Sequence, residues 1–357
     1  MSLKNFDDTK YYILCPAKMS TGGPKHLHQL GAELRNLNKK IFMVYYPAYM
    51  QDPVHQNYKH YNLSFTDQVE DKEKNILIVP EVNDSLLLSK SYKSIQKVLF
   101  WMSLDFFFIT NFRSLSKYLK SLIKIPFDLT YKFNELTQNY FGNITFEKYL
   151  KIIYLNIPFV NVLKKKDFKL NLSQSYYQYS ILKSKNVYSE FLNDFINNEF
   201  FKASKKISLT NKKNFICYNP SKSSNFMKRF IKMNSDLKFV PLQNYSMGEI
   251  IDILSKSKIY MDFGFHPGVD GLPRESAILK NCVITNREGS AFYSKAVPIN
   301  PRYKFEEKKN NLVKIRNLID KIFNNYESEI KNFQSYVDKL ENEELNFKTQ
   351  VKKIFNS

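Results

Sequence analysis

Glycine, cysteine and arginine are all scarce in this chain of 357 residues, and each scarcity excludes a class of protein or partner. The three cysteines are odd in number, widely spaced and without a CxxC pair, which argues against a disulfide framework and favours a reducing compartment. Cys15, Cys217 and Cys282 each lie in an apolar run, so we expect buried free thiols. No apolar run reaches the roughly 18 residues of a membrane span, and no signal-peptide pattern is present, so we expect a cytoplasmic protein.

Arginine supplies only seven of the 54 basic residues, although the formal net charge is +20. Arginine is the side chain that forks onto phosphates and base edges, and the lysines are spread along the chain without forming a stripe. We therefore expect no nucleic-acid partner. Two explanations of the charge stay open. One is the codon usage of an AT-rich genome, and the other is a positive surface that favours an anionic membrane leaflet or an anionic substrate.

Four of the nine glycines lie in one short segment, between residues 264 and 289. The pattern there predicts a strand over 259–263, a glycine-rich turn, a helix, a strand over 282–285 and a loop. This order places polar residues at the carboxyl ends of parallel strands, where α/β sheets bind ligands. The candidate residues of the turn and of the first helical turn are His266, Asp270, Arg274 and Glu275.

The rest of the chain predicts two parallel α/β sheets. A strand over 11–15, a helix from residue 25 and a strand over 41–45 form a unit that needs a right-handed crossover. Further strands are expected over 75–80 and 97–102, and an acid follows each of them, Glu81 and Asp105. A second series begins with a strand over 214–218, a helix over 226–233, a strand over 239–241 and a helix from residue 246. The tail from residue 306 predicts helices.

Residues 103–170 do not follow this alternation of strands and helices and are rich in Phe, Tyr and Lys. One interpretation is an inserted helical subdomain with a small core of its own. The other is an interfacial membrane anchor, since the apolar run 152–163 is followed by three lysines at 164–166.

Three loops carry residues suited to a phosphate or a sugar. Gly22 and Gly23 follow the first strand and can bring backbone amides toward an anion, although neither a Walker loop nor a dinucleotide fingerprint is present. Lys222, after strand 214–218, can reach a diphosphate. In the segment described above, a first-turn carboxylate such as Glu275 can accept two hydroxyls of a ribose or hexose, and Arg274 can bind phosphate bidentately. The helix start at Gly289, Ser290 and Ala291 offers further amides.

In this order, the three loops resemble those of GT-B glycosyltransferases, especially the retaining family 4 type. The resemblance rests on the pair Gly22-Gly23, on Lys222, and on the block 271–277 (GLPRESA), which is similar to the family's G-x-P-x-x-E-A motif. The block is one residue shorter than the motif, and Pro267 stands where the family has a paired upstream acid. His266 or Asp270 can fill that place. The tripeptide His266-Pro267-Gly268 also resembles a motif of bacterial sialyltransferase-like enzymes, in which a His-Pro pair contacts the donor nucleotide.

The resemblance implies an α/β fold of GT-B type, with two Rossmann-like domains whose parallel sheets face each other across a cleft. The acceptor domain would span 1–205 with the insertion at about 103–170, the nucleotide-sugar donor domain 206–330, and the C-terminal helices 331–357. It implies transfer of a sugar from a nucleotide-activated donor to a surface-polysaccharide or lipid-linked acceptor, with no metal and no cofactor. The composition and charge favour a cytoplasmic protein, free or at the inner face of the cell membrane.

The resemblance also implies roles for single residues. Glu275 would hold the ribose, and Gly289, Ser290 and Ala291 would line the pyrophosphate. Lys222 and Arg274 would neutralise the leaving group, assisted by amides near Gly22 and Gly23. The catalytic base or oxocarbenium stabiliser stays open among His266, Asp270, Glu81 and Asp105. Two rival functions also stay open: a GT-B-shaped nucleotide-sugar epimerase, and a basic scaffold without enzymatic activity that binds membrane or nucleic acid.

Overall fold

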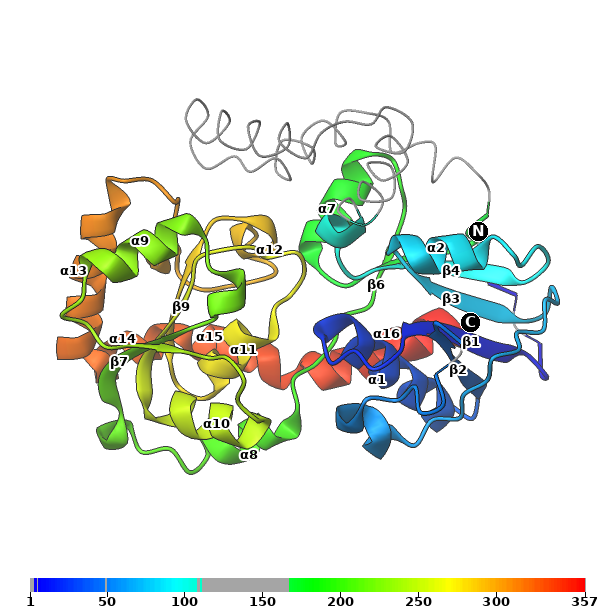
Figure 1. Cartoon of the computed structure of the whole chain (residues 1–357), viewed down its shortest axis with the longest axis horizontal. Coiled ribbons are helices and arrows are strands. Elements are labelled where there is room, and N and C mark those ends of the chain that lie inside the picture. The colour runs from blue at the N-terminus through cyan, green and yellow to red at the C-terminus, as the bar shows by residue number, and fades with distance from the viewer. Residues whose placement is uncertain (1–2, 5, 49, 108–109, 111–166, 357) are drawn as a thin grey trace. The chain divides into compact units, whose positions relative to one another are not determined.

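The computed structural model describes the whole chain except residues 1–2, 5, 49, 108–109, 111–166 and 357. The chain divides into two compact units (Figure 1). The N-terminal unit comprises residues 1–174, 178–192 and 348–357, and the C-terminal unit comprises residues 175–177 and 193–347. Apart from the three residues 175–177, the chain therefore passes from the first unit to the second at 192–193 and returns at 347–348.

The N-terminal unit is built on a six-stranded parallel sheet in the order β2-β1-β3-β4-β5-β6. Its strands are β1 (Lys10–Pro16), β2 (Lys40–Tyr46), β3 (Ile76–Pro80), β4 (Gln96–Trp101), β5 (Leu170–Ser173) and β6 (Glu190–Phe191). All residues of β3 and β4 are buried, as expected for parallel strands covered on both faces. Among the described residues, the helices between them are α1 (Gly22–Asn36), α2 (Asn83–Ser89) and α7 (Tyr176–Ser184, of which the first two residues belong to the C-terminal unit), with the 3-10 turn η1 (Gln56–Tyr61).

The C-terminal unit is built on a five-stranded parallel sheet in the order β11-β10-β9-β7-β8. Its strands are β7 (Lys213–Tyr218), β8 (Phe239–Pro241), β9 (Ser257–Asp262), β10 (Cys282–Asn286) and β11 (Lys304–Phe305). Its helices are α8 (Asn198–Ser204), α9 (Asn225–Met233), α10 (Met247–Lys256), α11 (Gly271–Ile278), α12 (Gly289–Phe292), α13 (Asn311–Asn324), α14 (Tyr326–Ile330), α15 (Gln334–Glu341) and the first part of α16 (Glu343–Phe355). Short 3-10 turns lie at η2 (Leu209–Asn211), η3 (Pro220–Lys222), η4 (Pro301–Tyr303) and η5 (Lys331–Phe333).

Each sheet has one point at which the direction of strand addition reverses. In the N-terminal sheet this point lies between β1 and β3, since β2 is added on one side of β1 and β3 on the other. In the C-terminal sheet it lies between β7 and β9, since β8 is added on the opposite side. The carboxyl ends of the strands at such a switch point are where open α/β sheets bind ligands.

The predicted fold class, two parallel α/β sheets, is confirmed, and every strand expected from the sequence is present. The short strands β5, β6 and β11 were not predicted, because two to four residues without an apolar run give no periodic signal. The helix expected from residue 25 begins at Gly22, so Gly22 and Gly23 form its first turn. All three cysteines are buried free thiols, as expected.

The predicted insertion over 103–170 lies almost wholly outside the described residues, and so does the apolar run with its lysines at 152–166. Among the residues that the structure does describe, no helix combines the length and the hydropathy needed to cross a membrane.

Candidate functional site

Three loops meet at the switch point of the C-terminal sheet, and backbone hydrogen bonds join them. The loop after β7 contacts the loop after β9 through Ser224 N–H, which donates to Phe263 O at 2.9 Å. The loop after β9 contacts the start of α12 through Ser290 N–H, which donates to His266 O at 3.0 Å. Asn286, at the end of β10, donates from Nδ2 to Gly264 O at 2.7 Å. The glycine-rich segment is therefore held from both sides.

Two glycines of this segment are required by close backbone approach. A Cβ built on Gly264 would lie 1.8 Å from Lys222 O, and one built on Gly289 would lie 2.0 Å from His266 O. Gly289 also has a φ of +50°, a conformation that other residues rarely adopt. These glycines let the three loops pack backbone against backbone. The concentration of glycine in the sequence thus has a steric cause.

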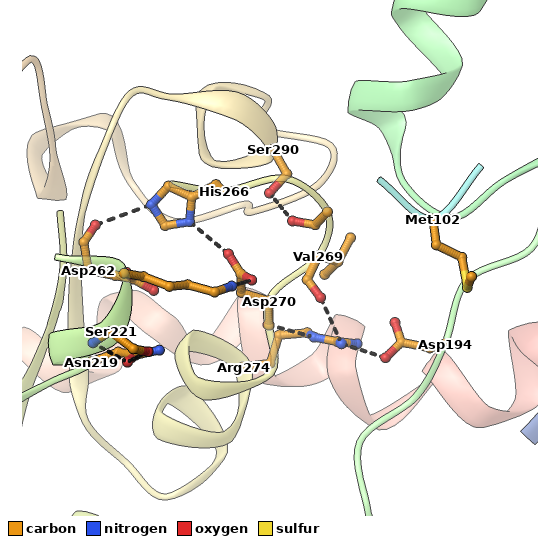
Figure 2. A network of polar contacts seen from close by, with 12 residues as sticks. Met102, Asp194, Asn219, Ser221, Asp262, His266, Val269, Asp270, Arg274 and Ser290 are labelled. Carbon is orange, nitrogen blue, oxygen red and sulfur yellow. Dashed lines mark hydrogen bonds and ion pairs between the residues drawn. The ribbon is translucent and has the colours of Figure 1, made fainter. Parts of the chain in front are cut away.

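A chain of charged side chains crosses these loops (Figure 2). The Lys222 ammonium forms an ion pair with Asp270 Oδ1, and the other carboxylate oxygen of Asp270 lies 3.0 Å from His266 Nδ1. The second ring nitrogen of His266, Nε2, lies 3.3 Å from the backbone oxygen of Asp262. We call Lys222, Asp262, His266 and Asp270 the switch-point cluster.

The surroundings of His266 favour its cationic form. Nδ1 lies 3.0 Å from Asp270 Oδ2 and Nε2 lies 3.3 Å from Asp262 O, so a ring with a proton on each nitrogen donates to both oxygens. Burial alone would lower the pKa of His266, but the carboxyls of Asp262 and Asp270 outweigh it and raise the pKa to about 9. Burial likewise opposes ionisation of Asp270, yet His266 and Lys222 lower its pKa. Burial raises the pKa of Asp262.

The cluster also brings ligand-type atoms of Asp262, His266 and Asp270 within 4.8 Å of one another. These residue types can bind a divalent cation, but their present contacts suit one poorly. Lys222 already bonds Asp270, and a metal on His266 would have to displace a proton that an acceptor holds. Lys222 and His266 occupy the places beside the Asp270 carboxylate that a metal ion would need.

The other candidates of this unit lie close to the cluster. The Glu275 carboxylate lies beside the first residue of α11, since a Cβ on Gly271 would be 3.2 Å from Glu275 Oε1. Ser290 Oγ donates to Gly268 O, and Ala291 N–H donates to Glu288 O at 3.0 Å. The amides of Ser290 and Ala291, predicted to line a pyrophosphate, therefore already have backbone acceptors.

Arg274 is directed away from the cluster's charged side chains. Its side chain is almost completely buried, and its guanidinium bonds Asp194 Oδ2 at 2.7 Å and Glu343 Oε2 at 2.8 Å. The same group donates to the backbone oxygens of Asp270 and Val269, each at 3.1 Å (Figure 2). The sequence interpretation assigned this arginine to a phosphate, and that role stays a prediction.

The candidates of the N-terminal unit gather at the switch point of its own sheet. Gly23, in the first turn of α1, lies against the side chain of Met102, which follows β4. Glu81, directly after β3, accepts backbone N–H bonds from Met102 at 3.2 Å and Ser103 at 2.7 Å. Asp105 is buried two residues further on. Burial raises the pKa of Glu81 to about 7, although the two N–H donors favour the carboxylate.

Sequence reasoning missed the partners of Arg274. Asp194 and Glu343 lie 80 and 69 residues from it along the chain. Asp194 lies in a polar connecting segment and Glu343 in the charged C-terminal tail. Nothing in the neighbouring sequence distinguishes either acid from an ordinary surface acid. Asp262, the last residue of β9, provides the backbone acceptor for His266.

No family model matches this sequence, and no curated protein sequence matches it. Solved structures do match over nearly the whole chain. HepE from Anabaena, in complex with UDP-glucose, has a TM-score of 0.59 at 8% identity and covers 97% of this chain and 99% of its own. Sucrose-phosphate synthase from Thermosynechococcus elongatus has a TM-score of 0.57 at 11% identity, with 98% and 99% covered.

A glycosyltransferase from Rickettsia africae has a TM-score of 0.53 at 13% identity and covers 98% of this chain and 95% of its own. Such low identities carry the fold and no more, so the resemblance to family 4 in particular stays a prediction. Together with two parallel sheets, each with candidate residues at its switch point, these matches show that the chain has the GT-B glycosyltransferase fold.

Proposed function

We propose that this protein transfers a sugar from a nucleotide-activated donor to a hydroxyl group of a saccharide or lipid-linked acceptor. The observation that carries the proposal is the switch-point cluster. It places an ammonium and an imidazolium beside helix starts, at the position in a GT-B-type sheet where ligands bind. The HepE structure, which holds UDP-glucose, supports a nucleotide-sugar of this kind as the donor.

In the proposed donor site, Lys222 meets the diphosphate. Its side chain is 32% exposed while that of Asp270 is 13% exposed, so the ammonium is the accessible end of the pair. Glu275, beside the start of α11, accepts the ribose hydroxyls. In place of the predicted phosphate contact, we propose that Arg274 does not touch the donor, because two buried carboxylates already balance its charge. Of the three residues predicted at the start of α12, Gly289 is the one whose amide we assign to the pyrophosphate.

We propose Glu81 as the general base that accepts the acceptor's hydroxyl proton. A base works best when its pKa lies near the operating pH, and burial brings the pKa of Glu81 to about 7. His266 is unsuited to this task, since both of its ring nitrogens carry protons that face acceptors. Asp105 remains the alternative base in the N-terminal unit.

We propose further that the transfer needs no bound metal, because a fixed cation aimed at the departing diphosphate can stabilise its developing charge. Full activity in EDTA, with no gain from added Mg²⁺ or Mn²⁺, is the expected result. A loss of activity in EDTA that Mn²⁺ restores would contradict this part of the proposal.

The acceptor class and a peripheral contact with anionic membrane at the inner face of the cell membrane rest on the sequence alone. The excess of lysine supports the membrane contact. Flotation of the protein with anionic liposomes at low salt, lost at high salt, is the expected result. Equal flotation with neutral liposomes would argue against an electrostatic contact.

A thermal-shift screen with UDP, GDP, ADP and CMP tests the function. A ligand at a hundred times its dissociation constant stabilises the folded state by about 2.7 kcal/mol, so at least one nucleotide should raise the melting temperature. Glu275→Ala should abolish that rise, while Glu341→Ala, a change at an exposed acid on α15, should keep it. If none of the four nucleotides raises the melting temperature of the wild-type protein, the proposal is wrong.

A further inference from the structure

Arg274 carries a buried charge that the proposed donor site does not use. The residue is 1% exposed, and its guanidinium is paired with Asp194 and Glu343, which are themselves buried. Taking three charges out of water is costly, and apolar residues of similar volume often serve stability equally well. The contacts of the triad are therefore the place to look for a role other than stability.

The contacts of Arg274 lead directly to the switch-point cluster. Nε donates to Asp270 O and one Nη donates to Val269 O, so the arginine holds the two peptide groups that precede α11. The Asp270 side chain leaves the same backbone position and bonds Lys222 and His266. A shift of the Arg274 guanidinium would therefore move the carboxylate that positions both cations.

The two carboxylates come from the two segments in which the chain enters and leaves the C-terminal unit. Asp194 follows the passage at 192–193, and Glu343 precedes the passage at 347–348. The segments also contact each other, since Asn193 Nδ2 donates to Glu343 O at 3.1 Å and the rings of Phe195 and Phe347 lie 5.3 Å apart. Arg274 thus connects the segments around Asp194 and Glu343 to the loop after β9.

We propose that Arg274 is a positioning residue that couples the switch-point cluster to the segments 193–197 and 342–347. Through the backbone of Val269 and Asp270, the conformation of these segments sets the place of the Asp270 carboxylate, and with it the place of the Lys222 ammonium. By reciprocity, a ligand that binds Lys222 also changes these segments. The proposal rests on the proposed function only in taking the cluster as the site that binds the donor diphosphate.

Amide hydrogen exchange of the full chain without ligand is the first test. Asp194→Asn and Glu343→Gln each remove one carboxylate and leave the other to balance Arg274, so both variants should fold. Arg274→Lys keeps the charge but loses the planar fork that serves several acceptors together. Exchange at residues 264–271 should become about tenfold faster in these variants, since each weakens a charge-assisted hydrogen bond.

Asp236→Asn is the matched control, because Asp236 is 60% exposed and pairs with Arg316 at 2.7 Å on the surface of the same unit. We expect it to leave exchange at 264–271 unchanged. Wild-type exchange at 264–271 in both single-acid variants would overturn the proposal. Uniformly faster exchange across the whole C-terminal unit would also overturn it, because that result would mean that Arg274 only stabilises the fold. If Arg274→Lys does not fold, the two acid variants decide this test.

The second test adds UDP. In the wild-type protein, UDP should slow exchange at 264–271 and also at 193–197 and 342–347, and Arg274→Lys should lose the effect on the latter two segments. Protection at 264–271 alone in the wild type would overturn the coupling while leaving the proposed function intact. If UDP protects none of these segments, the proposed function fails for UDP, and the ligand-free comparison still decides the coupling.

Discussion

The two switch points of this molecule have the same place in their sheets but opposite chemistry. At the C-terminal switch point, Lys222 and His266 both bond the Asp270 carboxylate, and the raised pKa of His266 favours its cationic form. At the N-terminal switch point, the acid Glu81 is bonded to neutral backbone N–H groups of Met102 and Ser103. Fixed positive charge suits the binding of an anion, whereas a buried carboxyl with a pKa of about 7 suits proton transfer.

The two switch points also differ in how tightly their backbones pack. A Cβ on Gly22, in the first turn of α1, would meet nothing within 4 Å, whereas a Cβ on Gly289 would clash with His266 O. The loops of the C-terminal unit pack backbone against backbone, whereas Gly22 has open space beside it. A side chain is therefore tolerated at Gly22 and not at Gly289.

The largest expected effect is on catalysis by the N-terminal switch point. Glu81→Gln should lower turnover by about 10²- to 10⁴-fold, the usual contribution of a general base. In the wild-type enzyme the rate should fall as the pH drops below about 7, because the base becomes protonated. Turnover measured from pH 5 to 9 checks both expectations, with Glu73→Gln, a change at an exposed acid of the same unit, as control. Unchanged turnover in Glu81→Gln would transfer the role to Asp105 or another group.

The next effect concerns the charge at the C-terminal switch point. The pKa of His266 is raised from 6.5 to about 9, so the folded protein holds a proton that the unfolded chain releases above pH 6.5. This stabilisation is fully present below pH 6.5 and is lost as the pH rises through 9, a fall of about 3 kcal/mol in the free energy of unfolding. Urea unfolding at pH 6 to 9 should show a shallower decline in His266→Gln.

The matched control for this measurement is His60→Gln, since His60 is an exposed histidine of the other unit. It should decline with pH as the wild type does. Parallel pH profiles for the wild type and His266→Gln would mean that His266 is neutral in the folded protein, and the contrast in charge between the two switch points would weaken.

A smaller effect is expected from the packing of the two glycines. Gly289→Ala should cost about 1–3 kcal/mol, because alanine is strained at a φ of +50° and its Cβ meets a backbone oxygen. Gly22→Ala should change stability by less than about 0.5 kcal/mol, because its Cβ has open space in a helical first turn. Thermal unfolding of both variants checks the difference. Equal costs would show that the two loops are equally constrained.

Much of this fold could be predicted from the sequence, because its central strands are apolar runs bounded by glycine, proline and polar residues. The same pattern located Glu81 and the loop around His266, since each follows a strand directly. The position of a residue directly after a strand can be predicted from the neighbouring sequence. The contacts that determine its charge come from distant parts of the chain and cannot.

The ion pairs could not be predicted, because their partners are distant in the chain. Nothing near Lys222 identifies Asp270, 48 residues away, and nothing near Arg274 identifies Asp194. The sequence therefore assigned Arg274 to a phosphate on the strength of its residue type. Its burial and its two carboxylates depend on the segments 193–197 and 342–347, which are far from α11 in the sequence.

The most direct test of the donor site is a calorimetric titration of UDP into the wild-type protein, Lys222→Met and Lys228→Met. Lys228 is an exposed cation on α9, six residues from Lys222, and so controls for a change in net charge. We expect Lys222→Met to weaken UDP binding about 10- to 100-fold, the value of a hydrogen bond to a charged group, and Lys228→Met to bind as the wild type does. Equal weakening in both variants, or in neither, would contradict a diphosphate site at the C-terminal switch point.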